Sequence, residues 1–154
     1  MTDYSTSDSR AQRQVEGWLI QEFFRKLGVR EDEYEYNNTT STKKEDVSFK
    51  FDAISEQHSV LVEVYARQGK LKSAQRHKVA NDALKMMLYE AIQGRQYKKF
   101  FVFSCEDAKK SFQTGWRGSL DKHLDIRFEL IRLPDDMREL VLMAQREQNM
   151  NARK

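Results

Sequence analysis

The fold is decided by residues 47–65, VSFKFDAISEQHSVLVEVY. Apolar residues recur at every second position of its first half: Val47, Phe49, Phe51 and Ala53. This period of two predicts a strand over 47–54. Residues 60–65 are rich in valine and predict a second strand. Only EQHS, residues 56–59, separates the two, so the stretch predicts an antiparallel hairpin with a tight turn.

Helices and strands alternate on both sides of this hairpin. Apolar spacing predicts helices over 11–27, 70–93, 106–123 and 135–148, and strands over 97–104 and 125–133. Residues 36–42 fit a short edge strand or a loop. Two strands joined by a helix in one sheet form a right-handed parallel crossover. We therefore predict one α/β domain over 1–154 with a mixed sheet, and flexible tails at 1–9 and 149–154.

The composition is typical of a globular protein and limits the classes of function to consider. The 154 residues are 39% hydrophobic and 11% aromatic, enough for a normal core, and 27 basic against 24 acidic residues give a charge of only +3. No apolar run approaches the ~20 residues that a membrane span requires. The N-terminus also lacks the positively charged segment followed by an apolar segment that is typical of a signal peptide. We expect a cytoplasmic protein without a membrane partner.

Several kinds of site have no support in the sequence. One cysteine, Cys105, excludes an internal disulfide and a cysteine-cluster zinc site. Three scattered histidines do not indicate a histidine-rich metal site, and the glycines form no nucleotide-binding motif. The side chains that remain available for a catalytic or binding site are carboxylates, lysines and amides.

Two carboxylates face each other if the hairpin turn is centred between Gln57 and His58. Positions whose numbers add up to 115 then pair, which puts Asp52 opposite Glu63. Opposed side chains share one face with Cβ atoms roughly 5 Å apart, where like charges repel and burial adds a desolvation penalty. A divalent cation, Mg²⁺ or Mn²⁺, would remove both costs. A slipped register, or a salt bridge to Lys50, stays open as the alternative.

A third acid lies on the first predicted helix. Glu16 falls inside the apolar arc that includes Leu19, Phe23 and Leu27, and so faces the core side. The alternative is a first-turn acid that interacts with the helix dipole from a partly solvated position.

The segment after Glu63 is strongly basic. Residues 67–78, RQGKLKSAQRHK, contain no acid and five cations: Arg67, Lys70, Lys72, Arg76 and Lys78. An acidic, metal-binding pair beside a positive segment suits a phosphodiester substrate. Taken alone, such a run indicates a solvated helix face.

These features resemble the PD-(D/E)xK nuclease superfamily, which has the restriction-endonuclease-like fold. Asp52 matches its first acid, and Glu63-Val64-Tyr65 matches its (D/E)-x-K tripeptide, over a region of resemblance from 11 to 104. The resemblance implies a mixed β-sheet core flanked by helices. It also implies that Asp52, Glu63 and the Val64 carbonyl ligate Mg²⁺ (or Mn²⁺), with Glu16 as an accessory acid.

The sequence departs from the family pattern at Tyr65, where the usual residue is a lysine. A phenol with a pKa near 10 cannot supply positive charge at pH 7. Some family members take a lysine or glutamine from the next helix instead. The rise per residue puts the second to third turn of that helix level with Glu63, so Gln75 and Lys78 are expected to substitute, with Lys70 and Lys72 as alternatives.

The same helix carries a second pattern. Its most continuous apolar arc is predicted to face the core: His77, Ala80, Leu84, Met87, Leu88 and Ala91.

The leading hypothesis is a magnesium-dependent nuclease, an endo- or exonuclease, that hydrolyses phosphodiester bonds in nucleic acid, with DNA as the expected substrate. The expected catalytic residues are Glu16, Asp52, Glu63, Gln75 and Lys78. Nucleic acid is expected to contact Arg67, Lys70, Lys72 and Arg76. The alternative is a catalytically impaired nuclease-fold module that binds nucleic acid or protein. A second alternative is a homodimer formed through helix 135–148, which contains four consecutive apolar residues from Leu140 to Met143.

Overall fold

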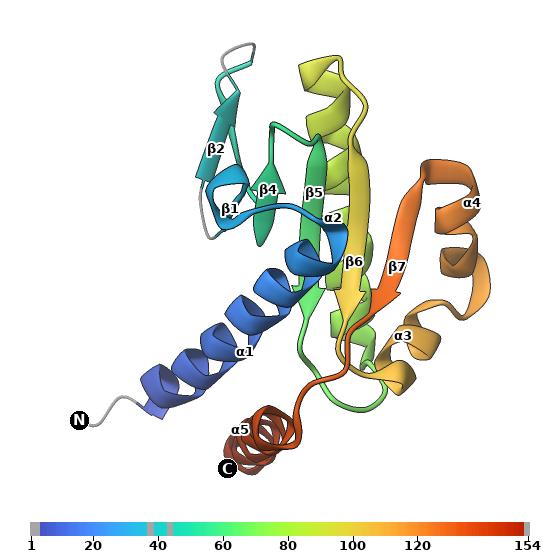
Figure 1. Ribbon diagram of the computed structural model, residues 1–154. Helices are drawn as coiled ribbons and strands as arrows, with labels where there is room; N and C mark the ends of the chain where they lie inside the picture. Colours follow the sequence, from blue (N-terminus) through green and yellow to red (C-terminus); the bar gives the residue numbers. More distant parts are fainter. Residues whose placement is uncertain (1–3, 37–38, 43–44, 153–154) are drawn as a thin grey trace.

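The structure is a computed structural model that describes residues 4–36, 39–42 and 45–152 (Figure 1). Its α-helices are α1 Tyr4–Leu27, α2 Ser73–Gln93, α3 Glu106–Phe112, α4 Leu120–Leu124 and α5 Asp135–Ala152. Two 3₁₀ helices, η1 Glu31–Glu33 and η2 Gly115–Ser119, join them. The strands are β1 Glu35–Tyr36, β2 Thr39–Thr42, β3 Val47–Lys50, β4 Ala53–Ser55, β5 Val60–Tyr65, β6 Lys98–Phe103 and β7 Ile126–Leu130.

Five strands form a mixed sheet in the order β1-β4-β5-β6-β7. β4 and β5 are the antiparallel hairpin, and β5, β6 and β7 run parallel to one another. Pairing of Ala53 with Val62 and of Ser55 with Val60 is the predicted register. The predicted α/β class with a mixed sheet flanked by helices is confirmed.

The prediction of one continuous strand over 47–54 is wrong. The chain bends at Asp52, and the segment before the bend, β3, pairs with β2 in a separate two-stranded sheet. Only β4, after the bend, pairs with β5. The rings of Phe49 and Phe51 both make edge-to-face contacts with the Tyr89 ring of α2. These contacts pack this part of the chain against that helix. The segment 36–42 contributes to both sheets through β1 and β2, while residues 37–38 lie outside the described part.

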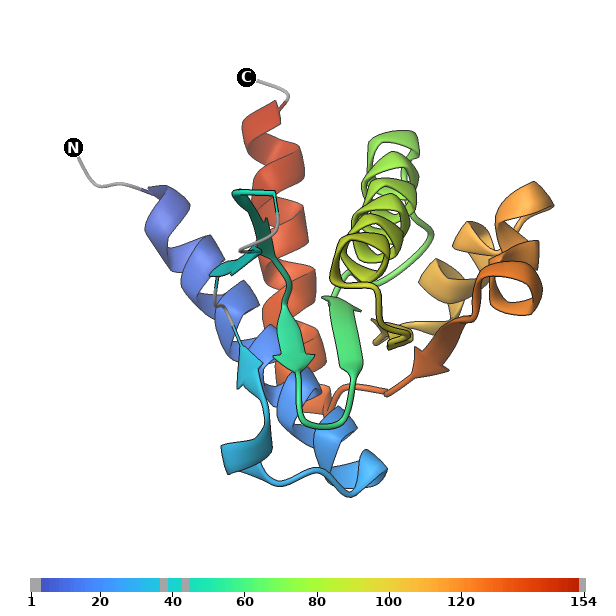
Figure 2. The same ribbon diagram turned by 90° about the horizontal axis from the view of Figure 1, so that it is seen from above.

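Helices cover both faces of the large sheet (Figures 1 and 2). The valines of β5 point to the face that α1 and α5 cover, where α5 packs on α1. Leu61 and Tyr65 point to the opposite face, which α2 covers beside α3 and α4. Val141 of α5 is buried in the first of these cores, whereas Leu140 and Met143 of the same apolar run are 38% and 53% exposed. Dimerisation through this helix stays a prediction. None of the helices in the described ranges has the length and apolar character needed to cross a bilayer.

Several predicted boundaries differ from the observed elements. α1 begins at Tyr4 and α5 continues to Ala152, so most of both expected tails is helical; residues 1–3 and 153–154 lie outside the described part. The single helix expected over 106–123 is divided into α3, η2 and α4. Gly115, with a φ of 76°, stands at this division, in a backbone region that glycine adopts without strain.

Helix α2 presents a different face to the sheet than its apolar arc predicted. Its buried residues are Val79, Asp82, Ala83, Met86 and Tyr89. Leu84 and Leu88 of the predicted arc are 63% and 49% exposed, and His77 is exposed as well. The predicted orientation of this helix is therefore wrong. The helix is rotated about its own axis, so that a different face packs against the sheet.

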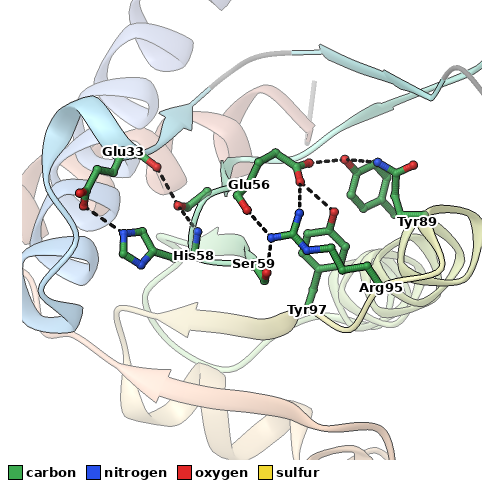
Figure 3. Close-up of polar contacts among 9 residues, drawn as sticks. Glu33, Glu56, His58, Ser59, Tyr89, Arg95 and Tyr97 are labelled. Atoms are coloured by element: carbon green, nitrogen blue, oxygen red, sulfur yellow. Dashed lines mark hydrogen bonds and ion pairs between the residues drawn. The ribbon is translucent and has the colours of Figure 1, made fainter.

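A polar network holds the turn of the β4–β5 hairpin (Figure 3). The Glu56 carboxylate accepts hydrogen bonds from the Tyr89 and Tyr97 hydroxyls and is paired with the Arg95 guanidinium. Arg95 also donates to the Glu56 carbonyl and to the Ser59 hydroxyl. These contacts connect the turn to the end of α2 and the start of β6, and so keep β5 in place.

Candidate functional site

Asp52 lies where the chain leaves the large sheet. The ladder between β4 and β5 ends at the pair Ala53–Val62, so no further residue of β4 pairs with Val64. The Asp52 Oδ2 atom accepts a hydrogen bond of 2.9 Å from the Val64 amide instead. A buried amide without an acceptor is costly, so the side chain of Asp52 stabilises the strand at its open edge.

Glu63 lies next to Asp52. It is 3% exposed, and its carboxyl group is close enough to that of Asp52 for the two to share a hydrogen bond. The structure thus brings the predicted acidic pair together at the point where the two strands diverge.

Glu63 also belongs to a buried cluster, which we define as Glu63, Tyr65, Asp82 and Lys85. The Lys85 ammonium lies 2.7 Å from Glu63 Oε1 and 3.5 Å from Asp82 Oδ1, and it donates to the Lys50 carbonyl at 2.7 Å. The Tyr65 hydroxyl donates to Asp82 Oδ2 at 2.9 Å. The cluster forms because residues two apart on β5 share one face, as do residues three apart on α2.

Burial controls the protonation of this cluster. It raises the pKa of Glu63 to about 9, with the neighbouring Asp52 and Asp82 adding to the effect and Lys85 opposing it. Burial lowers the pKa of Lys85, but the carboxylates of Glu63 and Asp82 outweigh it and the net pKa is raised. Burial also raises the pKa of the Tyr65 phenol well above its ordinary value. Burial and the neighbouring acids therefore favour the protonated form of Glu63 in the metal-free protein.

A cavity of about 210 Å³ opens beside the acidic pair. Predicted site residues line it: Glu16 from α1, Val64 from β5, Arg67 from the following loop, and Gln75 and Lys78 from α2. It adjoins the acids through Val64, whose amide binds Asp52. Burial raises the pKa of Glu16, Gln12 and Lys78 oppose this, and Asp52 adds to it. The structure therefore gathers five of the predicted residues around one space.

Three predicted cations are placed elsewhere. Lys70 is exposed and does not line the cavity. The Lys72 ammonium donates to the Asn149 side chain at 3.2 Å, and Arg76 donates to the Leu71 carbonyl at 3.3 Å. These residues border the cavity from the outside rather than line it.

The sequence analysis missed Lys85 and Asp82. It expected Gln75 and Lys78 to lie level with Glu63, yet the ammonium that contacts Glu63 comes from Lys85. The connection 66–72 carries the chain past the end of β5, so α2 begins only at Ser73 and a later turn faces Glu63. An aspartate flanked by buried Val79 and Ala83 was the available signal, because a charged group on a buried face needs a partner.

The donor atoms fit a hard divalent cation. The Val64 amide binds one oxygen of Asp52 and Lys85 contacts one oxygen of Glu63, so each carboxyl group has a second oxygen for which the structure gives no such partner among the described residues. The Val64 carbonyl faces the same side as the Val64 amide, since both main-chain groups of a strand residue point to one neighbour. Oxygen ligands of this kind suit Mg²⁺ or Mn²⁺. Within the described ranges, no three acidic, histidine or cysteine side chains are grouped so as to hold a metal ion.

Comparisons with known proteins identify no relative of this chain. No family model, no curated protein and no solved structure matches it. The functional argument therefore rests on the geometry around Asp52, Glu63 and the adjoining cavity.

Proposed function

We propose that this protein is a metal-dependent nuclease of the restriction-endonuclease-like fold that hydrolyses phosphodiester bonds in nucleic acid, with DNA as the substrate. One observation supports this most directly. Asp52 is anchored on the amide of Val64, near the buried Glu63. The two acids do not line the cavity themselves, but Val64 does, together with Arg67 and Lys78. A negative pair adjoining a positive cavity is suited to hold a metal ion and a phosphate side by side.

Each residue has a role in this proposal. Asp52, Glu63 and the Val64 carbonyl would hold Mg²⁺ or Mn²⁺, and Glu16 would assist directly or through water. The bound ion would polarise the phosphate and lower the pKa of a water molecule. Lys78 and Gln75 would contact the phosphate from the cavity, while Lys85 orients Glu63 through their 2.7 Å contact. Tyr65, in the place of the motif lysine, supports Asp82 through its hydroxyl.

Other cations would widen the contact with nucleic acid. Arg67 lines the cavity, and Lys70, Lys72 and Arg76 lie along the adjoining loop and helix. Contacts of this kind to phosphates add affinity without sequence preference and weaken as salt rises. A cytoplasmic location and a DNA substrate belong to the same proposal.

The test is cleavage of plasmid and of single-stranded DNA with Mg²⁺ or Mn²⁺, together with calorimetric titration of Mn²⁺. We expect Asp52→Asn and Glu63→Gln to abolish cutting and Mn²⁺ binding. Asp121→Asn, which alters an exposed acid on α4, is the control and should behave as the unaltered protein. Wild-type protein that neither cuts nor binds Mn²⁺ would defeat the proposal.

A second candidate function is a binding module that lost catalysis. The contact between Lys85 and Glu63 favours it, because Glu63 already has a partner at 2.7 Å without a metal ion. Salt-sensitive DNA binding that persists in Glu63→Gln, with no cleavage by the wild type, would support this alternative.

A further inference from the structure

We infer that the cavity beside Asp52 and Glu63 receives one unpaired nucleotide of the substrate strand. The preferred substrate is then single-stranded nucleic acid, or an end that is not base-paired, rather than a continuous duplex. The inference rests on the proposed nuclease function and adds the strand state of its substrate.

The walls of the cavity set the first limit on the ligand. They come from α1, from the end of β5 and the segment that follows it, from α2 and from α5. Gln145 of α5 is bound twice to the Gln68 backbone, accepting from its amide at 2.8 Å and donating to its carbonyl at 3.0 Å. This pair of hydrogen bonds holds α5 against the loop and keeps the space closed on that side.

The volume sets the second limit. About 210 Å³ is less than the roughly 300–1,000 Å³ of pockets that hold drug-sized ligands. A stacked, base-paired duplex cannot enter such a space, whereas a single nucleotide can be inserted part-way. An enzyme acting on a duplex would first have to unpair a base, at a cost of a few kcal/mol.

The charges define a place for phosphate. Arg67 and Lys78 are the two cations in the lining, against one acid, Glu16. The Arg67 Nε atom is buried, and no described residue accepts a hydrogen bond from it. Because an unpaired buried donor is costly, an acceptor from a ligand would stabilise it. A phosphate oxygen is such an acceptor, and arginine matches its geometry.

The remaining lining suits a nucleobase. Four glutamines line the cavity: Gln12, Gln75, Gln145 and Gln148. Gln145 is taken up by the Gln68 backbone, Gln12 donates to Glu16 and Gln75 accepts from the Lys72 amide, so Gln148, the Gln12 oxygen and the Gln75 nitrogen are left to contact a ligand. A side-chain amide offers both a donor and an acceptor, which are the groups presented by base edges. Apolar side chains, among them Leu71 and Val141, line the rest and can contact the flat faces of a base. A free sulfate or phosphate ion would use the cations but leave the amides and the apolar wall without a role.

The test measures binding without catalysis. Fluorescence anisotropy in EDTA compares a labelled oligothymidine strand with the same strand annealed to oligoadenosine of equal length, a blunt-ended duplex without unpaired nucleotides. We expect the single strand to bind at least about tenfold more tightly. Arg67→Gln should weaken its binding about tenfold, as expected for the loss of one charge-assisted hydrogen bond. Arg138→Gln, an exposed arginine of α5 outside the cavity, should leave it unchanged.

A second variant tests the cavity independently, and its thermal unfolding shows whether the variant is folded. Ala144→Phe places a ring in the cavity and should abolish the preference for the single strand while the protein still unfolds cooperatively on heating. Equal or tighter binding of the duplex by the wild type, or a preference that survives Ala144→Phe, would overturn the inference. These results are separate from cleavage, so a protein that prefers single strands but never cuts them defeats only the proposed function.

Discussion

The Asp52 carboxylate binds the Val64 amide at 2.9 Å, in the position that a neighbouring strand would otherwise occupy. The acid is therefore part of the sheet edge as well as part of the candidate site. The same carboxyl group lies close enough to Glu63 to raise the pKa of that acid. The break between β3 and β4 and the acidic pair are thus a single structural feature.

This double role predicts that two substitutions of Asp52 will differ. Asp52→Ala removes the acceptor and leaves the Val64 amide without its partner, so it should lower the free energy of unfolding by about 1–3 kcal/mol. Asp52→Asn retains an acceptor and removes the charge, and should cost less. Both should weaken Mn²⁺ binding by more than ~100-fold. This loss exceeds the ~10–100-fold expected when a residue that only hydrogen-bonds to a metal ligand is replaced. Urea denaturation and calorimetry measure the two effects separately, and equal losses of stability would contradict the structural role.

Glu63 predicts a pH dependence of stability in metal-free buffer. Its pKa is about 9 in the folded protein and 4.5 without the fold, so between these values the folded state keeps a proton that the unfolded state releases. Its contribution to stability is therefore full below about pH 4.5 and is lost as the pH rises toward 9. The slope for this one group is at most about 1.4 kcal/mol per pH unit.

Urea denaturation between pH 5 and 8.5 in EDTA measures this slope. Glu63→Gln cannot titrate and should show a flatter profile than the wild type. Parallel profiles for the two proteins would show that Glu63 is ionised in the fold at neutral pH.

The two lysines of α2 should separate stability from activity. Lys85 pairs with Glu63 at 2.7 Å and its side chain is 26% exposed, so Lys85→Met should reduce stability by about 1–3 kcal/mol. Lys78 lines the cavity on an exposed part of the helix, and Lys78→Met should change stability by less than ~0.5 kcal/mol. Cleavage should fall at least ~100-fold in Lys78→Met if it contacts the reacting phosphate. Full cleavage by Lys78→Met would transfer that role to Lys85.

Tyr65 should prove structural. Its hydroxyl donates to Asp82 at 2.9 Å, and its ring packs against Phe101 and Phe103. Tyr65→Phe should cost about 1–3 kcal/mol, because it leaves a buried carboxylate oxygen without its donor. Tyr65→Lys restores the family motif but replaces a packed ring, so we expect it to be less stable than Tyr65→Phe and no more active. A gain in cleavage by Tyr65→Lys would refute this role.

The turn network offers a prediction remote from the site. Tyr97→Phe removes the 2.8 Å hydrogen bond to Glu56 and should lower stability by about 0.5–1.5 kcal/mol. Metal binding and cleavage should be unaltered at temperatures where the variant is folded. A selective loss of cleavage would mean that the turn is coupled to the acids.

The hairpin and its register could be predicted, because alternation and turn length are local properties. The pairing of Ala53 with Val62 places Asp52 beside Glu63, as the position of the turn required. The orientation of α2 could not be predicted in this way. Its apolar residues cover more than one face, and the arc with Leu84 and Leu88 is left exposed while Asp82 and Met86 are buried. Periodicity shows that such a helix has an apolar side, but contacts with the sheet select the side that is used.

Local patterns along the chain were enough to predict the hairpin, the mixed α/β class, the adjacency of two acids and the basic segment that follows them. Each depends on residues close together in the chain. Three features became apparent once the chain was folded: which lysine contacts Glu63, where the first hairpin strand breaks, and that α1, α2 and α5 line a cavity together with Val64. These features depend on how segments distant in the chain pack together. That packing is set by the combined burial of all apolar surfaces, which no local pattern in the sequence specifies.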